Sequence, residues 1–496
     1  MGRFILAFDQ GTTSSRALIF DEEMNVVGSG QQEFKQIYPQ PGFVEHDPSE
    51  IWQTSLAMAR KAIERAGIDA GEIAAIGITN QRETSLIWER ATLKPLSNAI
   101  VWQDRRTSEI CEHLKAEGHG AMIAAKTGLL LDPYFSATKL QWLLDRTQDF
   151  RRRGGDHEIC FGTVDSWLIA NLTKGATFKT DATNASRTML FNIHNGDWDE
   201  ELLRLFDVPR AMLGDVEDCA GDFGIADKSY FGHEIPIRGV AGDQHAALIG
   251  QACFEPGMMK STYGTGCFAL LNTGERAIAS SQRLLTTIAY QLDGTRHYAL
   301  EGSIFIAGAG VQWLRDEVGV IEKACECDDL ASQSNLDDPV CLVPAFAGLG
   351  APYWRADVRG ALFGLTRGTG RNEIIRAALE AVGYQTRDLM QAIGKDWPDF
   401  LENAQKLRVD GGMTASGWTM QFLADILQCS VERAQNAETT ALGVAYLAGL
   451  TTGLYPDRSE FAQGWRSDCL FEPKMAQSDA DAKYNAWTGY VARLCE

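Results

Sequence analysis

The chain has 496 residues, with 46 lysines and arginines against 66 aspartates and glutamates, which gives a formal net charge of −20. Hydrophobic residues make up 45% and charged residues 23%, a balance typical of globular domains and not of disordered chains. The length predicts two to four domains. So negative a chain is unsuited to binding nucleic acid, where affinity depends on Lys and Arg contacting phosphates. An anionic small ligand is not excluded, because the field inside a pocket can oppose the global charge.

No apolar stretch approaches the roughly 18 residues that would cross a bilayer, and the apolar start of the chain is interrupted at Asp9, too early for a secretory leader. The eleven cysteines are scattered. Only Cys325 and Cys327 are close together, without the second pair or the histidines of a zinc site. We therefore expect reduced thiols, no membrane span and a cytoplasmic location.

The first 20 residues predict two strands joined by a tight turn. Residues 4–8 and 16–20 are apolar runs, and residues 9–15 (DQGTTSS) have turn chemistry between them. The backbone N–H groups and hydroxyls of such a turn suit a phosphate. Asp9 follows the first strand directly, as either a magnesium-facing carboxylate or a turn-capping residue would.

A helix is expected over residues 48–66. Asp47 is its expected N-cap, Pro48 comes first in the helix, Glu50 stands at the capping-box position, and Gly67 marks the stop. Further strands are predicted at 73–79, 159–161, 240–241 and 407–410. Because strands alternate with helices, the predicted class is α/β with mixed sheets.

The second half of the chain restarts the same pattern. Residues 258–271 again read as strand, Gly-Thr turn and strand, about half the chain length after the first such unit. This predicts a duplication into two similar α/β domains, 1–251 and 252–496, that face each other. Residues 316–338, with eight Asp and Glu against one Lys, are expected to form a solvated surface segment.

The common nucleotide signatures G-x-x-x-x-G-K-[ST] and G-x-G-x-x-G are absent. Instead, polar or glycine residues follow several predicted strands, and an aromatic lies in a charged cluster. They are Asp9, Arg82, Glu83, Trp102, Asp243, Gly411 and Gly412. Each alone has an ordinary structural explanation. Since ligands in open α/β sheets bind at the carboxyl ends of strands, together they predict a cleft for phosphate and hydroxyl groups.

Nine segments then carry a resemblance to a known family. They are DQGTTSSR (9–16), GITNQRET (77–84), NAIVWQDRRT (98–107), GLLLDPYFSATKLQWLL (128–144), TDATNASRT (180–188), GVAGDQHAA (239–247), STYGTGCFALLNTG (261–274), LEGSIF (300–305) and LRVDGG (407–412). The chain resembles the FGGY carbohydrate kinases, and its QRE, VWQDRR and GDQ segments resemble the members that phosphorylate glycerol. The resemblance implies two RNase H-like domains of the actin, hexokinase and Hsp70 ATPase type, flanking a deep cleft.

The resemblance also implies ATP-dependent phosphorylation of glycerol to sn-glycerol 3-phosphate, with ATP and Mg²⁺ required and Asp243 as the general base. The glycerol pocket would consist of Arg82, Glu83, Trp102, Tyr134, Asp243, Gln244 and Phe268. The nucleotide would meet Thr12, Thr13, Ser14, Arg16, Gly264, Thr265, Gly308, Gln312, Gly412 and Ser416. Asp9 and Asp243 would face the metal. The family also implies a homodimer or homotetramer.

Several positions depart from the family pattern. Among them, His245 replaces a second Gln, and Ser416 replaces an Asn on the adenine side. Two other functions stay open. One is a kinase for another small polyol or ketose, which the presence of Trp102 and Phe268 disfavours if the substrate is larger. The other is a non-catalytic ATP clamp of the actin or chaperone type, which need not retain a hydroxyl-binding pocket.

Overall fold

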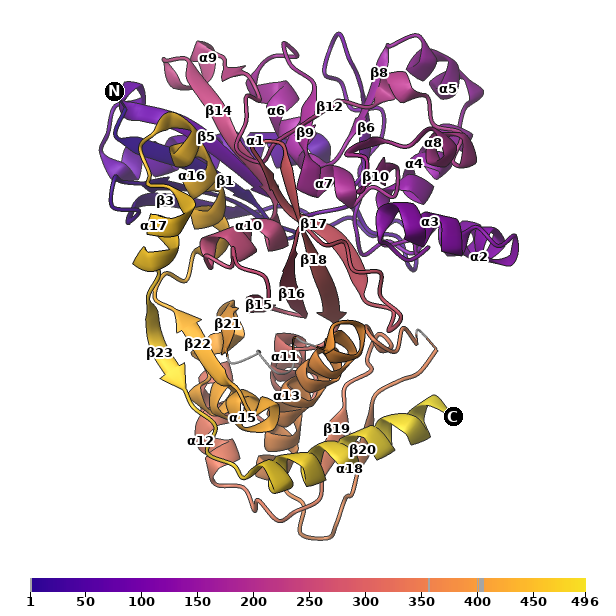
Figure 1. Ribbon diagram of the computed structural model, residues 1–496, viewed down its shortest axis with the longest axis vertical. Helices are drawn as coiled ribbons and strands as arrows, with labels where there is room; N and C mark the ends of the chain where they lie inside the picture. The colour runs from indigo at the N-terminus through magenta and orange to yellow at the C-terminus, as the bar shows by residue number, and fades with distance from the viewer. Residues whose placement is uncertain (1, 356, 399, 401–405) are drawn as a thin grey trace.

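The structure is a computed structural model that describes residues 2–355, 357–398, 400 and 406–496. One large mixed sheet lies in each half of the chain (Figure 1). The first has, in spatial order, β13 (Ile225–Ala226), β14 (Ile235–Gly242), β5 (Ile73–Asn80), β1 (Phe4–Gln10), β2 (Ser14–Phe20) and β3 (Val26–Glu33). The second has β17 (Leu285–Leu292), β18 (Thr295–Ile304), β16 (Cys267–Gly274), β15 (Met259–Tyr263), β21 (Lys406–Asp410), β22 (Ser430–Ala434) and β23 (Ser467–Phe471).

The two sheets share one topology. In the first, β1, β2 and β3 are antiparallel neighbours, β1, β5 and β14 run parallel, and β13 closes the edge antiparallel. In the second, β15, β16 and β18 are antiparallel, β15, β21 and β22 run parallel, and β23 closes the edge antiparallel. Among the described strands of the two sheets, β17, which pairs with β18, is the one without a counterpart in the first sheet. Order and direction therefore agree strand by strand, which supports the expected duplication.

Two helices cross between the halves. α10 (Asp243–Gly250) follows β14, and α16 (Thr439–Thr452) follows β22. They pack on each other; α16 lies on β1, β5 and β14 of the first sheet, while α10 also contacts β15, β16 and β17 of the second. In Figure 1 the gold α16 lies accordingly beside the indigo strands of the first half. One hydrophobic core, which includes Ile5, Leu248, Leu270 and Val444, is shared by both halves.

The remaining elements cover the sheets or connect them. The longer helices are α1 (Pro48–Ala66), α2 (Ser108–Ala116), α3 (Gly120–Thr127), α4 (Ser136–Asp145), α5 (Gln148–Gly155), α6 (Val164–Leu172), α11 (Gly308–Asp316), α13 (Arg371–Asp396), α15 (Gly417–Leu427) and α18 (Gln477–Cys495). The shorter ones are α7 (Ala182–Ser186), α8 (Glu200–Leu205), α9 (Lys228–Phe231), α12 (Cys327–Ser332), α17 (Arg458–Gly464) and the 3-10 turn η4 (Gly412–Ala415). The two-stranded sheets pair β4 (Glu45–His46) with β7 (Ala99–Ile100), β6 (Leu86–Glu89) with β8 (Ile159–Gly162), β9 (Lys179–Asp181) with β12 (Asp215–Glu217), β10 (Phe191–Asn192) with β11 (Asp197–Trp198), and β19 (Cys341–Val343) with β20 (Ala361–Phe363).

Helix α1 has the bounds that its end signals predict. The Asp47 carboxylate accepts a hydrogen bond from the Ser49 N–H at 2.8 Å, and Gly67 ends the helix in the left-handed conformation. The expected capping role of Glu50 was wrong. Its carboxylate accepts instead from the backbone N–H of Lys35 at 3.1 Å, because β3 ends within its reach.

All eleven cysteines are free, and most are buried. Within the described residues, no helix has the length and apolar character needed to cross a membrane. Most of the acidic side chains of 316–338 are exposed, although Asp338 is buried and the carboxylate of Asp328 accepts a hydrogen bond from Ser416.

Candidate active site

The carboxyl ends of three parallel strands bring the predicted residues together. Asp9 lies near the end of β1, Arg82 follows β5, and Asp243 opens α10 directly after β14. Because β1, β5 and β14 are adjacent in the sheet, these ends meet at one edge. The matching edge of the second sheet lies opposite, and it supplies Phe268 from β16.

Arg82 and Asp243 form the centre of the predicted substrate pocket. Arg82 Nε lies 3.2 Å from Asp243 Oδ1, which also accepts the N–H of Gln244 at 2.7 Å. The Asp243 side chain is 30% exposed and the Arg82 side chain only 2%, so the carboxylate is the more accessible of the two groups. Burial raises the pKa of Asp243, and the Arg82 guanidinium opposes that rise.

Three aromatic rings from different elements pack together, and one of them, that of Phe268, lies beside this pair. The Trp102 ring packs edge-on against Tyr134 at 5.6 Å and against Phe268 at 6.1 Å between centroids. The Arg82 guanidinium lies 5.9 Å from the centre of the Phe268 ring. Trp102 Nε1 donates to the hydroxyl of Thr12 at 3.0 Å, which ties this aromatic wall to the β1–β2 turn. The structure therefore gathers the aromatic residues that the sequence assigned to one pocket.

The backbone of Glu83 has a conformation that is unusual for a residue with a side chain. Its φ of 58° lies in the left-handed region, which non-glycine residues seldom adopt. Its carbonyl accepts the Ser85 and Ser136 hydroxyls at 2.9 and 3.0 Å. The ammonium of Lys139, which is fully buried, lies 3.4 Å from the same oxygen and 2.6 Å from the carbonyl of Tyr134. These bonds hold the Glu83 turn, and its strain is of the kind found at functional sites.

Arg187 and Glu301 belong to the same cluster, and they are absent from the residues expected there. Glu301 accepts from Arg82 at 2.6 and 3.1 Å and from Arg187 at 3.0 Å. Arg187 also donates to Glu83 at 2.7 Å. Both residues lie in segments that carry the family resemblance, and Glu301 interrupts an apolar strand. A charge in such a position is the signal that could have found it.

Lys260, on β15 of the second sheet, is another residue of the site that was not expected there. Its buried ammonium donates to Gln244 Oε1 at 2.5 Å and to the Thr262 hydroxyl at 2.9 Å. Burial lowers the pKa of Lys260, while Asp410 and Asp243 oppose that effect. His245 lies behind the pocket, fully buried and 3.3 Å from the Thr287 hydroxyl.

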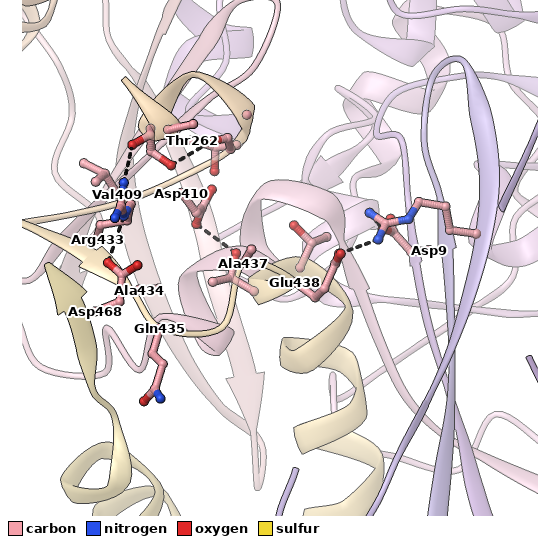
Figure 2. A pocket seen from close by; sticks show the side chains of 17 residues that line it. Asp9, Thr262, Val409, Asp410, Arg433, Ala434, Gln435, Ala437, Glu438 and Asp468 are labelled. Carbon is pink, nitrogen blue, oxygen red and sulfur yellow. Dashed lines mark hydrogen bonds and ion pairs between the residues drawn. The ribbon is translucent and has the colours of Figure 1, made fainter. Parts of the chain in front are cut away.

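A cavity of about 490 Å³ adjoins this pocket and lies between the halves (Figure 2). Asp9, Arg16 and Gly412 line it, as expected, together with Glu438 and Asp410, which were not expected. Arg16 bridges two of the acidic residues, because its guanidinium pairs with Glu438 and lies 3.5 Å from Asp9. Burial raises the pKa of Asp9 to about 6, although Arg16 opposes the rise.

The remaining nucleotide-assigned residues lie on two turns and on two neighbouring elements. They are Thr12, Thr13 and Ser14 at the β1–β2 turn, Gly264 and Thr265 at the β15–β16 turn, Gly308 and Gln312 on α11, and Ser416 before α15. The Gly308 N–H donates to the Gly264 carbonyl at 2.9 Å, so α11 begins against the β15–β16 turn. None of these eight residues is among those that line the cavity. The Ser416 hydroxyl instead caps α15 by accepting the Thr419 N–H at 3.0 Å.

The site has oxygen ligands suited to a hard cation. Asp9 and Asp243 lie near enough for the Asp243 charge to add to the raised pKa of Asp9. Among the described residues no group of three or more His, Cys, Asp or Glu side chains could hold a metal ion alone. Two carboxylates match Mg²⁺ instead, which keeps several waters and binds largely through substrate phosphates.

The fold and this site define a two-domain kinase, and comparison with known proteins gives its family. The N-terminal domain of the FGGY family of carbohydrate kinases matches residues 4–250, and the C-terminal domain of that family matches residues 259–452. The chain therefore belongs to the FGGY family of carbohydrate kinases.

Several individual glycerol kinases are similar to the chain over nearly its whole length. The chain is 60% identical to a glycerol kinase of Allorhizobium ampelinum over 493 residues, 99% of each chain, and 58% identical to one of Rhodopseudomonas palustris over 99% of this chain and 98% of that one. The crystal structure of Plasmodium falciparum glycerol kinase with ADP superposes with a TM-score of 0.92 at 38% identity, covering 99% of this chain and 98% of that one.

Proposed function

We propose that this chain transfers the γ-phosphoryl group of ATP to a terminal hydroxyl of glycerol, forming sn-glycerol 3-phosphate. The observation that carries the proposal is the pocket in which Arg82 and Asp243 lie against Trp102, Tyr134 and Phe268, beside the cavity that Asp9 lines. Polar groups on one side suit hydroxyls, and aromatic rings on the other suit the carbon edge of a small polyol. The curated relatives named above support glycerol as that polyol.

Asp243 is the proposed general base. A carboxylate does not remove a proton from a free alcohol outright, because the two pKa values lie far apart. Asp243 instead orients the attacking hydroxyl and accepts its proton late, as the bond to the phosphorus forms. The 3.2 Å contact with Arg82 Nε fixes the direction of the carboxylate, and its partial exposure leaves it open to the substrate.

The adjoining cavity would take the nucleotide. Arg16 and Gly412, which line it, would contact the nucleotide. The backbone N–H groups of the β1–β2 and β15–β16 turns, which do not line it, would contact phosphates by the family resemblance. Mg²⁺ would be held by Asp9 and Asp243 and, when bound, would offset the charge of the phosphates. The raised pKa of Asp9 fits this role, since it marks a carboxylate that lacks a full counter-charge in the protein alone.

The aromatic wall also favours glycerol over longer polyols. Trp102, Tyr134 and Phe268 pack ring to ring, so a longer carbon chain would have to displace one of them. The same wall would exclude water, which competes with glycerol for the phosphoryl group. We further propose a homodimer or homotetramer, from the family resemblance, and a cytoplasmic location, supported by the eleven free cysteines.

ADP release by the purified full chain with Mg-ATP tests this function. The substrates are glycerol, erythritol, dihydroxyacetone and xylulose, with a reaction that lacks any of them as the blank. We expect the highest kcat/KM with glycerol and little ADP in the blank. A preference for xylulose or erythritol would favour a different polyol or ketose kinase. ADP release that is the same with and without every substrate would favour the ATP clamp.

A further inference from the structure

Five charged side chains of the predicted substrate pocket form a continuous chain of ion pairs. In order they are Asp243, Arg82, Glu301, Arg187 and Glu83, and adjacent members are 3.2, 2.6, 3.0 and 2.7 Å apart. Four of the five side chains are no more than 2% exposed, the exception being Asp243. Glu301 comes from β18 of the second half, and the other four from the first half. The second half therefore supplies the central link.

Glu301 determines the direction of the Arg82 guanidinium. Its two carboxylate oxygens accept from Nη1 and Nη2 of Arg82, at 2.6 and 3.1 Å, in the forked geometry that fixes an arginine most firmly. With both of these nitrogens held, Nε is the one that faces Asp243. Burial acts to raise the pKa of Glu301, but Arg187 and Arg82 outweigh it and hold that pKa below its ordinary value. Glu301 therefore remains ionised.

Arg187 holds the carboxylate of Glu83 in a similar way. Its Nε donates to Glu83 Oε1 at 2.7 Å, and its Nη2 donates to Glu301. Its Nη1 is buried and has no hydrogen-bond partner among the described residues. The guanidinium carbon of Arg187 lies 6.0 and 5.3 Å from the ring centres of Tyr134 and Phe135. Arg187 is therefore held by its two carboxylate partners, Glu83 and Glu301.

We propose that Glu301 and Arg187 are positioning residues for phosphoryl transfer: Glu301 orients Arg82 toward Asp243, and Arg187 orients Glu83 toward the substrate. This inference rests on the proposed function, since it concerns the same pocket. Neither residue needs to touch the substrate. Each acts by holding a side chain that does, and the Glu301 link makes the geometry of the pocket depend on the second half of the chain.

Steady-state kinetics of the full-length Glu301→Gln variant provide the test. Gln keeps the size of the side chain but loses its charge and one acceptor, so Arg82 is no longer gripped by a fork. We expect kcat/KM for glycerol to fall about 10²-fold, as it does when a substrate-positioning group is misplaced by about an ångström. The KM for glycerol should rise, and the KM for ATP should stay within about threefold of wild type.

Two further variants separate positioning from stability. Arg187→Lys keeps the charge but cannot bridge both carboxylates, and should also raise the glycerol KM selectively. Glu301→Asp keeps the charge with a shorter reach, and should recover part of the kcat/KM that Glu301→Gln loses. If Glu301→Gln does not fold, Glu301→Asp and Arg187→Lys decide the question by the same KM comparison.

Glu380→Gln is the matched control. Glu380 is also a buried carboxylate of the second half, 3.7 Å from Arg376 and 3.6 Å from Lys483, but it has no partner in the pocket. This variant should lower the melting temperature and leave both KM values unchanged. A glycerol KM that stays at the wild-type value in the Glu301 and Arg187 variants would overturn the positioning proposal alone. Absence of glycerol turnover by the wild type would overturn the proposed function and, with it, this inference.

Discussion

Asp243 combines two properties that a base in phosphoryl transfer needs. Burial raises its pKa, which makes the carboxylate a better proton acceptor, and Arg82 at 3.2 Å keeps it from becoming protonated too readily. Its side chain is nevertheless 30% exposed, whereas those of its neighbours Arg82 and Glu83 are 2% and 1% exposed. The balance of burial and charge therefore leaves Asp243 as the most accessible carboxylate of the cluster.

The Asp243→Asn variant should separate binding from chemistry. The amide retains the size of the side chain but cannot accept the proton of the hydroxyl, so we expect kcat to fall about 10²- to 10⁴-fold. The Kd for glycerol, measured by calorimetry, should change less than about threefold, because Arg82, Trp102 and Phe268 remain. Asp222→Asn, at an exposed carboxylate paired with Arg238, is the control and should retain full activity. Turnover of Asp243→Asn near the wild-type rate would show that another group accepts the proton.

Asp165 is a buried carboxylate away from the pocket, and it predicts a pH effect on stability. Burial raises its pKa to about 7 and nearby Asp181 adds to the rise, while the Thr163 and Thr180 hydroxyls oppose it. The folded state therefore binds this proton more tightly than the unfolded state. Stability from this group is present below about pH 4 and is lost as the pH rises to about 7, at up to about 1.4 kcal/mol per pH unit.

The Asp165→Asn variant should lack that dependence. Its amide can still hydrogen-bond the two threonine hydroxyls, so the side chain stays satisfied without having to ionise. Relative to wild type, the melting temperature of the variant should rise between pH 4.5 and pH 7.5 when measured by calorimetry at matched scan rates. A difference in melting temperature that stays constant over this range would mean that Asp165 is ionised throughout.

At the scale of elements, the crossing of α10 and α16 explains how the halves are joined. A β-carbon at Gly250 would lie 1.9 Å from the Thr439 carbonyl, and one at Gly443 would lie 1.9 Å from the Ala246 carbonyl. The two backbones are therefore in direct contact, and glycine is required on each side of the crossing. α10 begins at Asp243, and α16 begins beside Glu438 of the cavity, so the crossing also sets the spacing between pocket and cavity.

Gly443→Ala should lower the stability of the protein by about 1–3 kcal/mol, because the added methyl group meets backbone that no rotamer change can move. Gly489→Ala is the matched control. Gly489 lies within helix α18 with no atom within 4 Å of the added β-carbon, so alanine should be neutral or stabilise by up to about 1 kcal/mol. Thermal unfolding of both variants gives the comparison, and equal melting temperatures would contradict the close crossing.

For the molecule as a whole, the local elements were predictable and the long-range pairs were not. The run of 4–8, the helix at 48–66 and the second strand–turn–strand unit are written in short stretches of sequence, and each lies where it was expected. Arg82 and Asp243 were found because they follow strands. Glu301 was missed because its partners are 219 and 114 residues away, and no local pattern encodes such pairs.

Glu438 was missed for the same reason, since its partner Arg16 is 422 residues away. Glu438 also shows that some of the acidic residues behind the net charge of −20 line the cavity. The cavity is itself acidic: Arg16 and Arg433 face Asp9, Asp410, Glu438 and Asp468. A polyanionic nucleotide would enter such a cavity only with a cation and with backbone N–H donors, which fits a requirement for Mg²⁺.

Phosphorus NMR of the complete reaction tests the central claim most directly. The full-length protein is incubated with Mg-ATP and glycerol, and the spectra are followed until the ATP is consumed. We predict one new phosphomonoester signal, that of sn-glycerol 3-phosphate, growing in equal amount with ADP and absent without glycerol. ATP converted to ADP and inorganic phosphate at a rate independent of glycerol would contradict the account.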